Sequence, residues 1–182
     1  TYAFDHRAIV LGRGSRIDRE LHSDAIQADG IPVYRRRSGG CSVLLDPGNV
    51  IVSLAYPLAT LGDVGQRIRQ LTDWLWGGLA RLGVEGLGQR GIADVVVGDR
   101  KVGGTSMSYS QGLLYYGASL LVSADIASMD RYLQHPPREP DYRRQRPHAQ
   151  FVTNLQAVAP HLPVANELAP LLQQQLALPS LT

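Results

Sequence analysis

The sequence predicts a mixed α/β domain in which helices pack on a largely antiparallel sheet. Short runs rich in valine, isoleucine and leucine are bounded by glycine, proline and asparagine, a pattern typical of strands joined by tight turns. One long segment carries apolar residues at helical spacing. The two kinds of segment alternate at irregular intervals, so a simple parallel sheet is not expected. A chain of 182 residues suits a single domain with its own core, which we expect to cover residues 1–182.

The first third of the chain is expected to hold four short strands. These apolar runs are residues 8–12, 31–36, 42–45 and 50–55. The first two are predicted to be buried, with one helix in the polar stretch 17–29 between them. The last two flank the turn Asp46-Pro47-Gly48-Asn49. The four strands therefore cluster around the glycine pair Gly39-Gly40.

The middle of the chain holds the longest predicted helix, residues 60–82. Leucine, isoleucine and valine recur there at helical spacing, and Thr60 and Asp63 are suited to its start. Three further strands are predicted, the first two forming a hairpin: residues 94–97, 100–102 and 113–122. A hairpin and short turns between strands make the sheet mostly antiparallel.

The last third is predicted to hold a helix, a mobile loop and a second helix, at residues 125–133, 135–148 and 164–176. Ser123 or Asp125 would cap the first helix. Pro170 is expected to kink or split the second, and the tail from Leu178 is expected to fray. Three arginines of the loop, Arg143, Arg144 and Arg146, form either a solvated charge run or a segment that orders over a bound nucleotide or docks an acidic partner.

Composition argues against several function classes. Hydrophobic residues make up 44% of the chain, and no apolar run approaches the roughly 20 residues of a membrane-spanning helix, so no membrane association is expected. A net charge of +2 is too small to predict a nucleic-acid partner. The single cysteine, Cys41, allows no internal disulfide, and the start of the chain resembles no secretory leader, which favours a cytoplasmic protein. The five histidines show no metal-ligand spacing.

Lys101 is the only lysine in the chain, since 17 of the 18 basic residues are arginines. Arginine is evidently accepted at every other basic position. Lysine differs because its ammonium is a compact point charge that can contact two oxygens at once. The sequence therefore marks Lys101 as a candidate catalytic residue.

Two runs of small residues accompany Lys101. Arg35-Arg36-Arg37 leads into Ser38-Gly39-Gly40-Cys41-Ser42, where a glycine loop beside guanidinium groups is suited to hold an anion. Val102-Gly103-Gly104-Thr105-Ser106 follows the lysine directly and is predicted as a second loop that exposes N–H and hydroxyl donors. Together they predict a site where an acyl or phosphoryl oxygen is polarised.

Two blocks of this sequence resemble the lipoate-protein ligase A family. Arg35 to Val43, followed by Asp46-Pro47-Gly48-Asn49, is similar to the family's R-R-x-S-G-G-G-A-V-x-H-D-x-G-N block. Asp94 to Ser106 is similar to its N-D, hairpin, R-K-[IV]-[SG]-G-[ST]-A block. Order and spacing agree. Weaker matches, which extend the resemblance over about residues 8–155, are Ser119-Leu120-Leu121, Ala124-Asp125 and Val152-Thr153-Asn154-Leu155.

The resemblance implies the fold of a biotin/lipoate protein ligase-like catalytic domain. It also implies ATP-dependent activation of lipoate or octanoate to an acyl-adenylate. The acyl group would then pass to a lysine of a lipoyl-domain acceptor, such as an E2 subunit or a glycine-cleavage H-like protein. By the same likeness, the family's first strand and helix are missing ahead of residue 8, as in a clipped chain. The small accessory domain that some members carry at the C-terminus is missing too, so the chain is expected either to need a separate accessory subunit or to perform only part of the reaction.

The resemblance also assigns site residues. Lys101 matches the catalytic lysine, and Asp94 would lie beside the phosphates and hold Mg²⁺. Contacts with ATP or the acyl-adenylate are implied for Arg36, Ser38, Gly39, Gly40, Cys41, Ser42, Val43, Leu44, Asn49, Asp94, Lys101, Gly104, Thr105 and Ser119. Apolar strand residues would line a narrow tunnel for the acyl chain.

Several positions depart from the family pattern. Cys41 replaces the third glycine, Leu45 a histidine, Ala93 an asparagine and Phe151 an arginine, and Tyr116-Gly117-Ala118 stands in place of His-His-Gly. Two alternatives follow. Cys41, between N–H donors and arginines, could be the nucleophile of an ATP-independent acyltransferase of the same fold. Leu45 and Ala93 could instead mark a relative that binds a lipoyl group or nucleotide without turnover.

Overall fold

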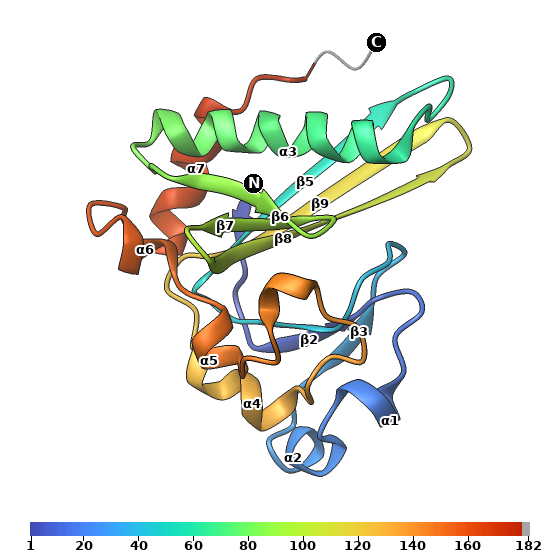
Figure 1. Ribbon diagram of the computed structural model, residues 1–182, viewed down its shortest axis with the longest axis vertical. Coiled ribbons are helices and arrows are strands. Elements are labelled where there is room, and N and C mark those ends of the chain that lie inside the picture. The colour runs from blue at the N-terminus through green and yellow to red at the C-terminus, as the bar shows by residue number, and fades with distance from the viewer. Residues whose placement is uncertain (180–182) are drawn as a thin grey trace.

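The computed structural model describes residues 1–179, which form two sheets with helices around them (Figure 1). The main sheet contains β1 (Tyr2–Ala3), β5 (Asn49–Pro57), β6 (Leu87–Arg90), β7 (Asp94–Val97), β8 (Arg100–Ser110) and β9 (Leu113–Leu121). The smaller sheet contains β2 (Ala8–Leu11), β3 (Val33–Arg35) and β4 (Val43–Leu45). The helices are α1 (Ile17–Glu20), α2 (Ser23–Ala28), α3 (Val64–Arg81), α4 (Met129–Tyr132), α5 (His148–Phe151), α6 (Leu155–Val158) and α7 (Ala165–Gln175), with 3₁₀ turns η1 (Ile126–Ser128) and η2 (Asp141–Arg143). The predicted mixed α/β class is confirmed.

The main sheet is antiparallel throughout, in the order β1-β5-β9-β8-β7-β6. Its longest pairing joins β5 to β9, from Asn49 opposite Leu121 to Pro57 opposite Leu113. The predicted hairpin forms between β7 and β8, with Gly98 at a φ of 62° in the turn. The strands follow the alternation of apolar residues in the sequence.

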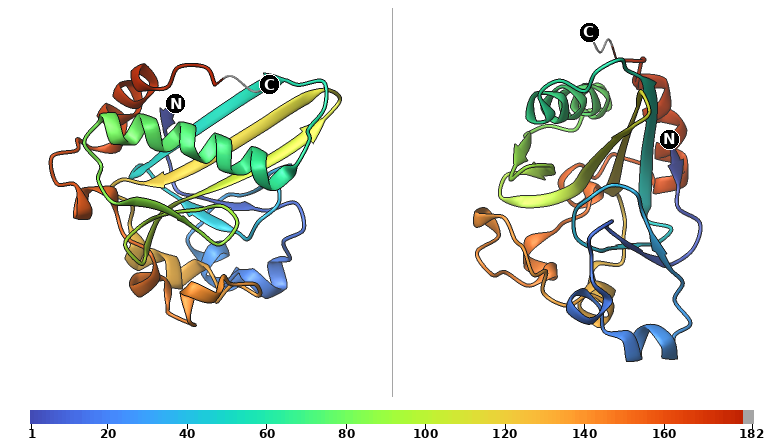
Figure 2. Two further views of the ribbon diagram at one scale, coloured as in Figure 1. Left: turned by 45° about the horizontal axis from the view of Figure 1, so that its top comes forward. Right: turned by 90° about the vertical axis from the view of Figure 1, so that its right-hand side faces the viewer.

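One face of this sheet is covered by α3, as Figure 2 shows. Alternate residues of β9, including Leu114 and Leu120, share a buried core with Leu71, Leu75 and Leu79 of α3 and with α7. Burying one such leucine contributes about 1.5–3 kcal/mol. Asp63 caps α3 by accepting a hydrogen bond from the Gln66 N–H at 2.6 Å. The helix was predicted to begin near Thr60 but begins one turn later.

The smaller sheet and four short helices form a lower layer (Figure 1). There β2 pairs in parallel with β3 and antiparallel with β4. A second apolar cluster holds this layer together, with Ile9 of β2 and Leu44 of β4 packed against residues from α4 and α5. Leu121 at the end of β9 belongs to the same cluster, so the main sheet is anchored to the lower layer.

Three predictions in the first two thirds of the chain were wrong. The stretch 17–29 holds two helices, because Leu21 between them is extended and buried in a β-bridge to Leu133. The strand predicted to be buried at 31–36 is β3, which covers only Val33–Arg35 and is exposed at one edge of the smaller sheet. The run 102–106 is not a loop but part of β8, so its backbone groups are paired with β7 and β9. The strands β1 and β6 were not predicted.

The last third also differs in part. The segment 125–133 is split into η1 and α4, and residues 135–148 contain η2 with Arg143 buried. Helix α7 runs through Pro170 without a break. The helices α5 and α6 were not predicted, since each has only four residues. Leu178 and Pro179 lie outside any helix, and the rest of the predicted frayed tail lies outside the described residues.

Among residues 1–179, no helix has both the length and the apolar character needed to cross a membrane.

Candidate active site

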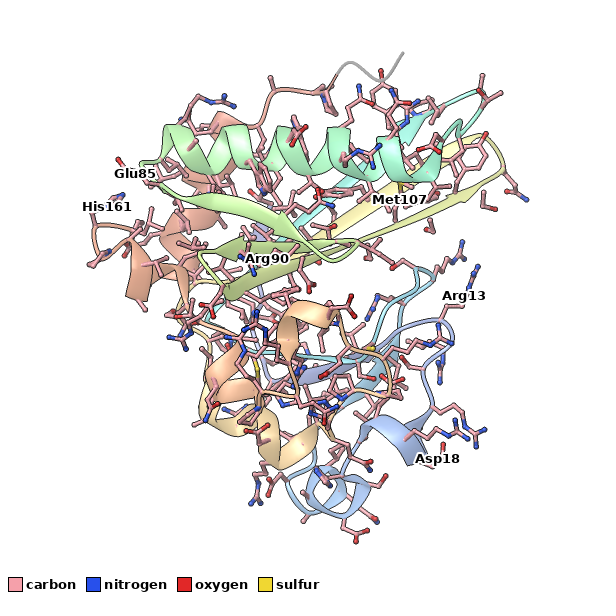
Figure 3. All side chains as sticks on the ribbon, viewed as in Figure 1. Arg13, Asp18, Glu85, Arg90, Met107 and His161 are labelled. Atoms are coloured by element: carbon pink, nitrogen blue, oxygen red, sulfur yellow. The ribbon has the colours of Figure 1, made fainter. Side chains whose placement is uncertain are left out.

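A cavity of about 960 Å³ lies between the main sheet and the lower layer. Its upper wall includes Ile51, Gly117 and Ser119, which alternate with the core residues of β5 and β9 and so project from the opposite face of the sheet. Apolar side chains from both layers contribute Phe4, Val10, Leu44, Ile51, Leu121 and Met129 to the lining. Arg90 of β6, labelled in Figure 3, lines the cavity where the two layers meet. The cavity can therefore hold an apolar chain together with a charged group.

Lys101 forms an ion pair in this cavity. Its Nζ lies 2.6 Å from Oδ1 of Asp94, and the two side chains are 26% and 17% exposed. The Tyr142 hydroxyl donates to the other oxygen of Asp94, Oδ2, at 2.8 Å. Burial and the neighbouring Asp94 carboxylate raise the pKa of Tyr142, so its hydroxyl remains a donor. The Lys101 ammonium is thus held in one place by a carboxylate that is itself fixed by hydrogen bonding.

The backbone of β8 brings Lys101 and the following glycines together. The register between β7 and β8 shifts between Val95 and Val96, as in a β-bulge, which redirects side chains along a strand. A Cβ atom on Gly104 would lie 3.2 Å from Lys101 Nζ, so glycine leaves room beside the ammonium. On the other side, Lys101 O accepts a hydrogen bond from the Thr153 N–H at 2.8 Å. The backbone at Lys101 is therefore held by its pairing with β7 and by the hydrogen bond from the Thr153 N–H.

The bend at Ser38–Ser42 is held by the guanidinium of Arg36. Its nitrogens donate to the carbonyl oxygens of Gly39 at 2.7 Å, Cys41 at 2.8 Å and Val10 at 3.0 Å. Arginine is suited to this role because its planar fork can donate to several oxygens at once. Arg36 therefore shapes the bend by donating to the bend's carbonyl oxygens, and the Arg36 side chain also lines the cavity.

The bend and β8 meet directly. Ser38 Oγ donates to Ser106 Oγ at 2.9 Å, across the two small-residue runs that the sequence singled out. Lys101 lines the same cavity as the second part of the bend, Gly40–Ser42. The predicted convergence of the lysine on the glycine bend is therefore present, although the second run is a strand.

Glu20 is a buried carboxylate in the cavity wall, 6% exposed, that holds the end of the bend. Its Oε2 accepts from the Ser42 N–H and the Ser42 hydroxyl, both at 2.7 Å, and from the Ser15 hydroxyl at 3.0 Å. Burial alone would raise the pKa of Glu20, but the hydrogen bonds from Ser42 and Ser15 lower it below its ordinary value. Glu20 is ionised at neutral pH and fixes Ser42.

Replacing Glu20 with glutamine is expected to lower the free energy of unfolding at pH 7 by about 1.5–3 kcal/mol, the usual contribution of hydrogen bonds to a charged group. Because the folded-state pKa is depressed, this contribution is present above the unfolded value of about 4.5 and is lost as pH falls through the folded pKa. Urea unfolding from pH 7 to pH 4 measures it. The control is Glu167→Gln at an exposed site on α7. Equal stability of Glu20→Gln and wild type at pH 7 would contradict the assignment.

The structure brings most of the predicted site residues together. Those that line the cavity are Arg36, Gly40, Cys41, Ser42, Val43, Leu44, Asn49, Asp94, Lys101, Gly104, Thr105 and Ser119. Ser38 and Gly39 do not line it, and Ser38 reaches it only through Ser106. Asn49 is among the lining residues, but its side chain is buried and hydrogen-bonded to backbone. Its amide nitrogen donates to Leu120 O, and its amide oxygen accepts from the Asp46 N–H.

Sequence reasoning missed Gly12, Glu20 and Tyr142. A glycine directly after a strand, such as Gly12, can indicate a close backbone approach, but only the structure shows that Gly12 lies against Gly40. Glu20 lies in a polar stretch that resembles any exposed helix. Tyr142 lies in the irregular loop, where no periodicity indicates which side chain points inward.

The Cys41 thiol lies in the cavity wall, where its Sγ contacts the carbonyl oxygen of Arg138 at 3.6 Å. Burial, and to a lesser extent the Glu20 carboxylate, raise the pKa of Cys41 above its ordinary value, although Lys101 and Arg36 act in the opposite direction. The thiol is therefore protonated at neutral pH, which disfavours a nucleophilic role.

Within the part of the chain that the structure describes, no three histidine, cysteine, aspartate or glutamate side chains are grouped to hold a metal ion. Asp94 offers one carboxylate, which Lys101 and Tyr142 already contact. Mg²⁺ commonly binds through one or two carboxylates together with substrate phosphates. Asp94 is thus suited to a magnesium ion that arrives with a nucleotide, not to one held by the protein alone.

Comparison with known proteins shows which family this chain is similar to. The family model of the lipoyl protein ligase A/B catalytic domain matches residues 2–177. A relative from Aeropyrum pernix, named "Putative lipoate-protein ligase A", is 36% identical over 124 residues, which are 68% of this chain and 46% of that protein. The chain spans less than half of the length of the curated relatives it matches.

Two solved structures share the fold. A bi-partite lipoate protein ligase with its E2 lipoyl domain, from Thermoplasma acidophilum, has a TM-score of 0.78 and 21% identity. A lipoate-protein ligase A bound with ATP has a TM-score of 0.76 and 20% identity. Each alignment covers 96% of this chain and 67% of the other. At such identities the likeness establishes the architecture.

Proposed function

The chain belongs to the lipoyl protein ligase A/B catalytic domain family, and from this premise we propose that it activates lipoate or octanoate with ATP for attachment to a lipoyl-domain protein. In the first step a carboxylate oxygen of the acid attacks the α-phosphorus of ATP, and the bond to pyrophosphate breaks. In the second step the amine of an acceptor lysine attacks the acyl carbon. The amide forms, the amine loses a proton, and AMP leaves.

The observation that carries this proposal is the position of Lys101 in one cavity with the Gly40–Ser42 bend. Its ammonium can donate to an α-phosphate oxygen and to the carbonyl oxygen of the mixed anhydride, where negative charge develops. Before substrate binds, Asp94 holds the ammonium at 2.6 Å, so little reorganisation is needed. The apolar part of the wall, including Ile51 and Leu121, is suited to bury the acyl chain.

Asp94 would hold Mg²⁺ together with the nucleotide phosphates, and the ion when bound would neutralise phosphate charge. The chain's own contribution is the placement of Lys101 and of the bend. Tyr142 keeps the Asp94 carboxylate oriented, with one oxygen towards Lys101.

We propose that the acceptor is a lipoyl domain and that the second step uses an accessory subunit. The Thermoplasma relative is bi-partite and was solved with its E2 lipoyl domain. The two steps can be separated experimentally, because adenylation needs only the acid and ATP.

The test is pyrophosphate release from ATP in the presence of lipoate or octanoate, with the acceptor domain and any accessory subunit added in separate arms. Release that depends on the acid is the expected result. ATP or lipoate binding by calorimetry without any release in any arm would instead favour a binding protein. If the protein shows neither ligand binding nor pyrophosphate release, the proposal is rejected.

Cys41→Ser is expected to retain adenylation and transfer within about threefold of wild type, because a protonated, partly buried thiol is a poor nucleophile. Mass spectrometry of the wild-type protein incubated with substrate should show no acyl adduct on the cysteine. Cys41→Ala is the matched control for hydroxyl effects. An acyl adduct that Cys41→Ser abolishes along with transfer would favour the ATP-independent acyltransferase.

A further inference from the structure

Arg143 places a buried cation in the cavity wall. It ends the 3₁₀ turn η2, where its N–H donates to Pro140 O at 2.8 Å, and the next two residues are left-handed, with φ of 52° at Arg144 and 60° at Gln145. This tight turn directs Arg143 inwards. Its side chain is only 5% exposed and lines the same cavity as Lys101. The segment 135–148 is therefore not a solvated charge run at this position.

The hydrogen-bonding groups of Arg143 are only partly used. Nε donates to Arg146 O at 3.0 Å, and the carboxylate of Glu139 lies 3.6 Å away from the same nitrogen. The guanidinium carbon lies 4.7 Å from the centre of the Phe151 ring, a cation–π contact. Nη2 is buried and has no hydrogen-bond partner. Buried N–H groups are rarely left without a partner, so this nitrogen requires an explanation.

Two other cations of the cavity wall are already engaged. Arg36 donates to carbonyl oxygens of the bend, and Lys101 is paired with Asp94. Among the cavity-lining residues that the structure describes, Arg143 is the cation with a buried donor left unpaired. Burial lowers the pKa of Arg143, which Glu139 and Asp130 partly offset, but an arginine keeps its proton in proteins. A permanent charge with an unused donor is suited to an anion.

We propose that Arg143 binds a phosphate oxygen of the nucleotide through its Nη2 group. The inference rests on the proposed function and adds a residue that the sequence motifs do not assign. A phosphate suits the site better than the single carboxylate of the acid, because Asp94 already neutralises Lys101 while ATP brings several negative charges. Phe151, which stands where the family motif has arginine, serves as the platform on which this guanidinium stacks.

The test is calorimetric titration of wild type and Arg143→Met with ATP, with adenosine and with octanoate. Methionine keeps the apolar stem against Phe151 and removes the charge and the unpaired donor. ATP is expected to bind at least about tenfold more weakly, the usual effect of losing a hydrogen bond to a charged group. Adenosine and octanoate should bind as in wild type. Because methionine also loses the hydrogen bond to Arg146 O and the cation–π contact with Phe151, thermal unfolding of the variant is measured beside the affinities to show that it is folded.

Arg144→Met is the matched control, because it removes the same charge from an exposed neighbour, and its ATP affinity should stay within threefold of wild type. If Arg143→Met does not fold, the affinities of Arg143→Lys decide. Lysine keeps the positive charge, so Arg143→Lys should still bind ATP more tightly than adenosine. Unchanged ATP affinity, an equal loss for ATP and adenosine, or a loss confined to octanoate would overturn the proposal. If wild type binds no ATP, the proposed function itself fails.

Discussion

Lys101→Met is expected to lower the rate of acyl-adenylate formation by at least about 100-fold, the usual effect of removing a preorganised donor from developing charge. The ammonium is held 2.6 Å from Asp94 in the same cavity as the glycine bend, and Lys101 is the only lysine in the sequence. Methionine keeps the length of the side chain and removes the charge. The measurement is pyrophosphate release at saturating ATP and octanoate.

The fold should survive this change. The Lys101–Asp94 pair is partly exposed, and such pairs contribute at most about 1 kcal/mol, while Tyr142 still donates to the carboxylate. Lys101→Arg should recover little activity, because the guanidinium is larger and cannot place one point charge between two oxygens. The control is Arg13→Met, which removes a positive charge from an exposed side chain at the surface (Figure 3). More than a tenth of wild-type activity in Lys101→Met would contradict the assignment.

The sequence predicted most of the residues that lie together in this cavity, because local motifs indicated them. The unique lysine, the glycine pair and the turn at 46–49 are local signals that can be recognised from residue type alone. Lys101, Asp94 and the bend lie in one cavity because β7 and β8 form the expected hairpin. The long-range contact between Ser38 and Ser106 joins the bend after β3 of the smaller sheet to β8 of the main sheet, and no local pattern encodes how the two sheets pack.

The errors share a physical cause. Gly103 and Gly104 resemble a loop, yet they lie in a central strand, where glycine is rarely used. A Cβ on Gly103 would lie 2.8 Å from Ser119 O, so glycine is required there by the close approach of β9 and not by a turn. In the same way, Leu21 interrupts a helical stretch because it is drawn into the lower core beside Leu133. Tertiary contacts overrode local propensity in both places.

The wall formed by residues 135–148 was the least predictable part. Its prolines and arginines have no period, so only the folded chain shows that Tyr142 and Arg143 point inwards while Arg144 points to solvent. Aromatic and guanidinium contacts hold this segment, with Arg90 and Arg143 stacked on Tyr142 and Phe151 respectively. The contact between Arg90 and Tyr142 joins residues far apart in the chain.

Gly12→Ala is expected to lower adenylation by about 100-fold and stability by about 1–3 kcal/mol, because the new methyl group cannot fit. A Cβ at Gly12 would lie 1.8 Å from Gly40 O and 2.9 Å from Gly40 C, whereas ordinary contact begins at 3.4 Å. Both neighbours are backbone atoms of the bend, so the bend must move by more than an ångström. That displacement also breaks the bonds from Arg36 that shape it.

Gly14→Ala supplies the matched control, since a Cβ there meets nothing within 4 Å and the residue is only two positions away. It should leave pyrophosphate release and urea unfolding close to wild type. The two variants therefore separate the loss of a close backbone approach from any general effect of replacing glycine in this turn. Because Lys101 stays in place in Gly12→Ala, lost activity would show that the ammonium alone is insufficient. Wild-type activity in Gly12→Ala would mean that the bend does not hold the nucleotide.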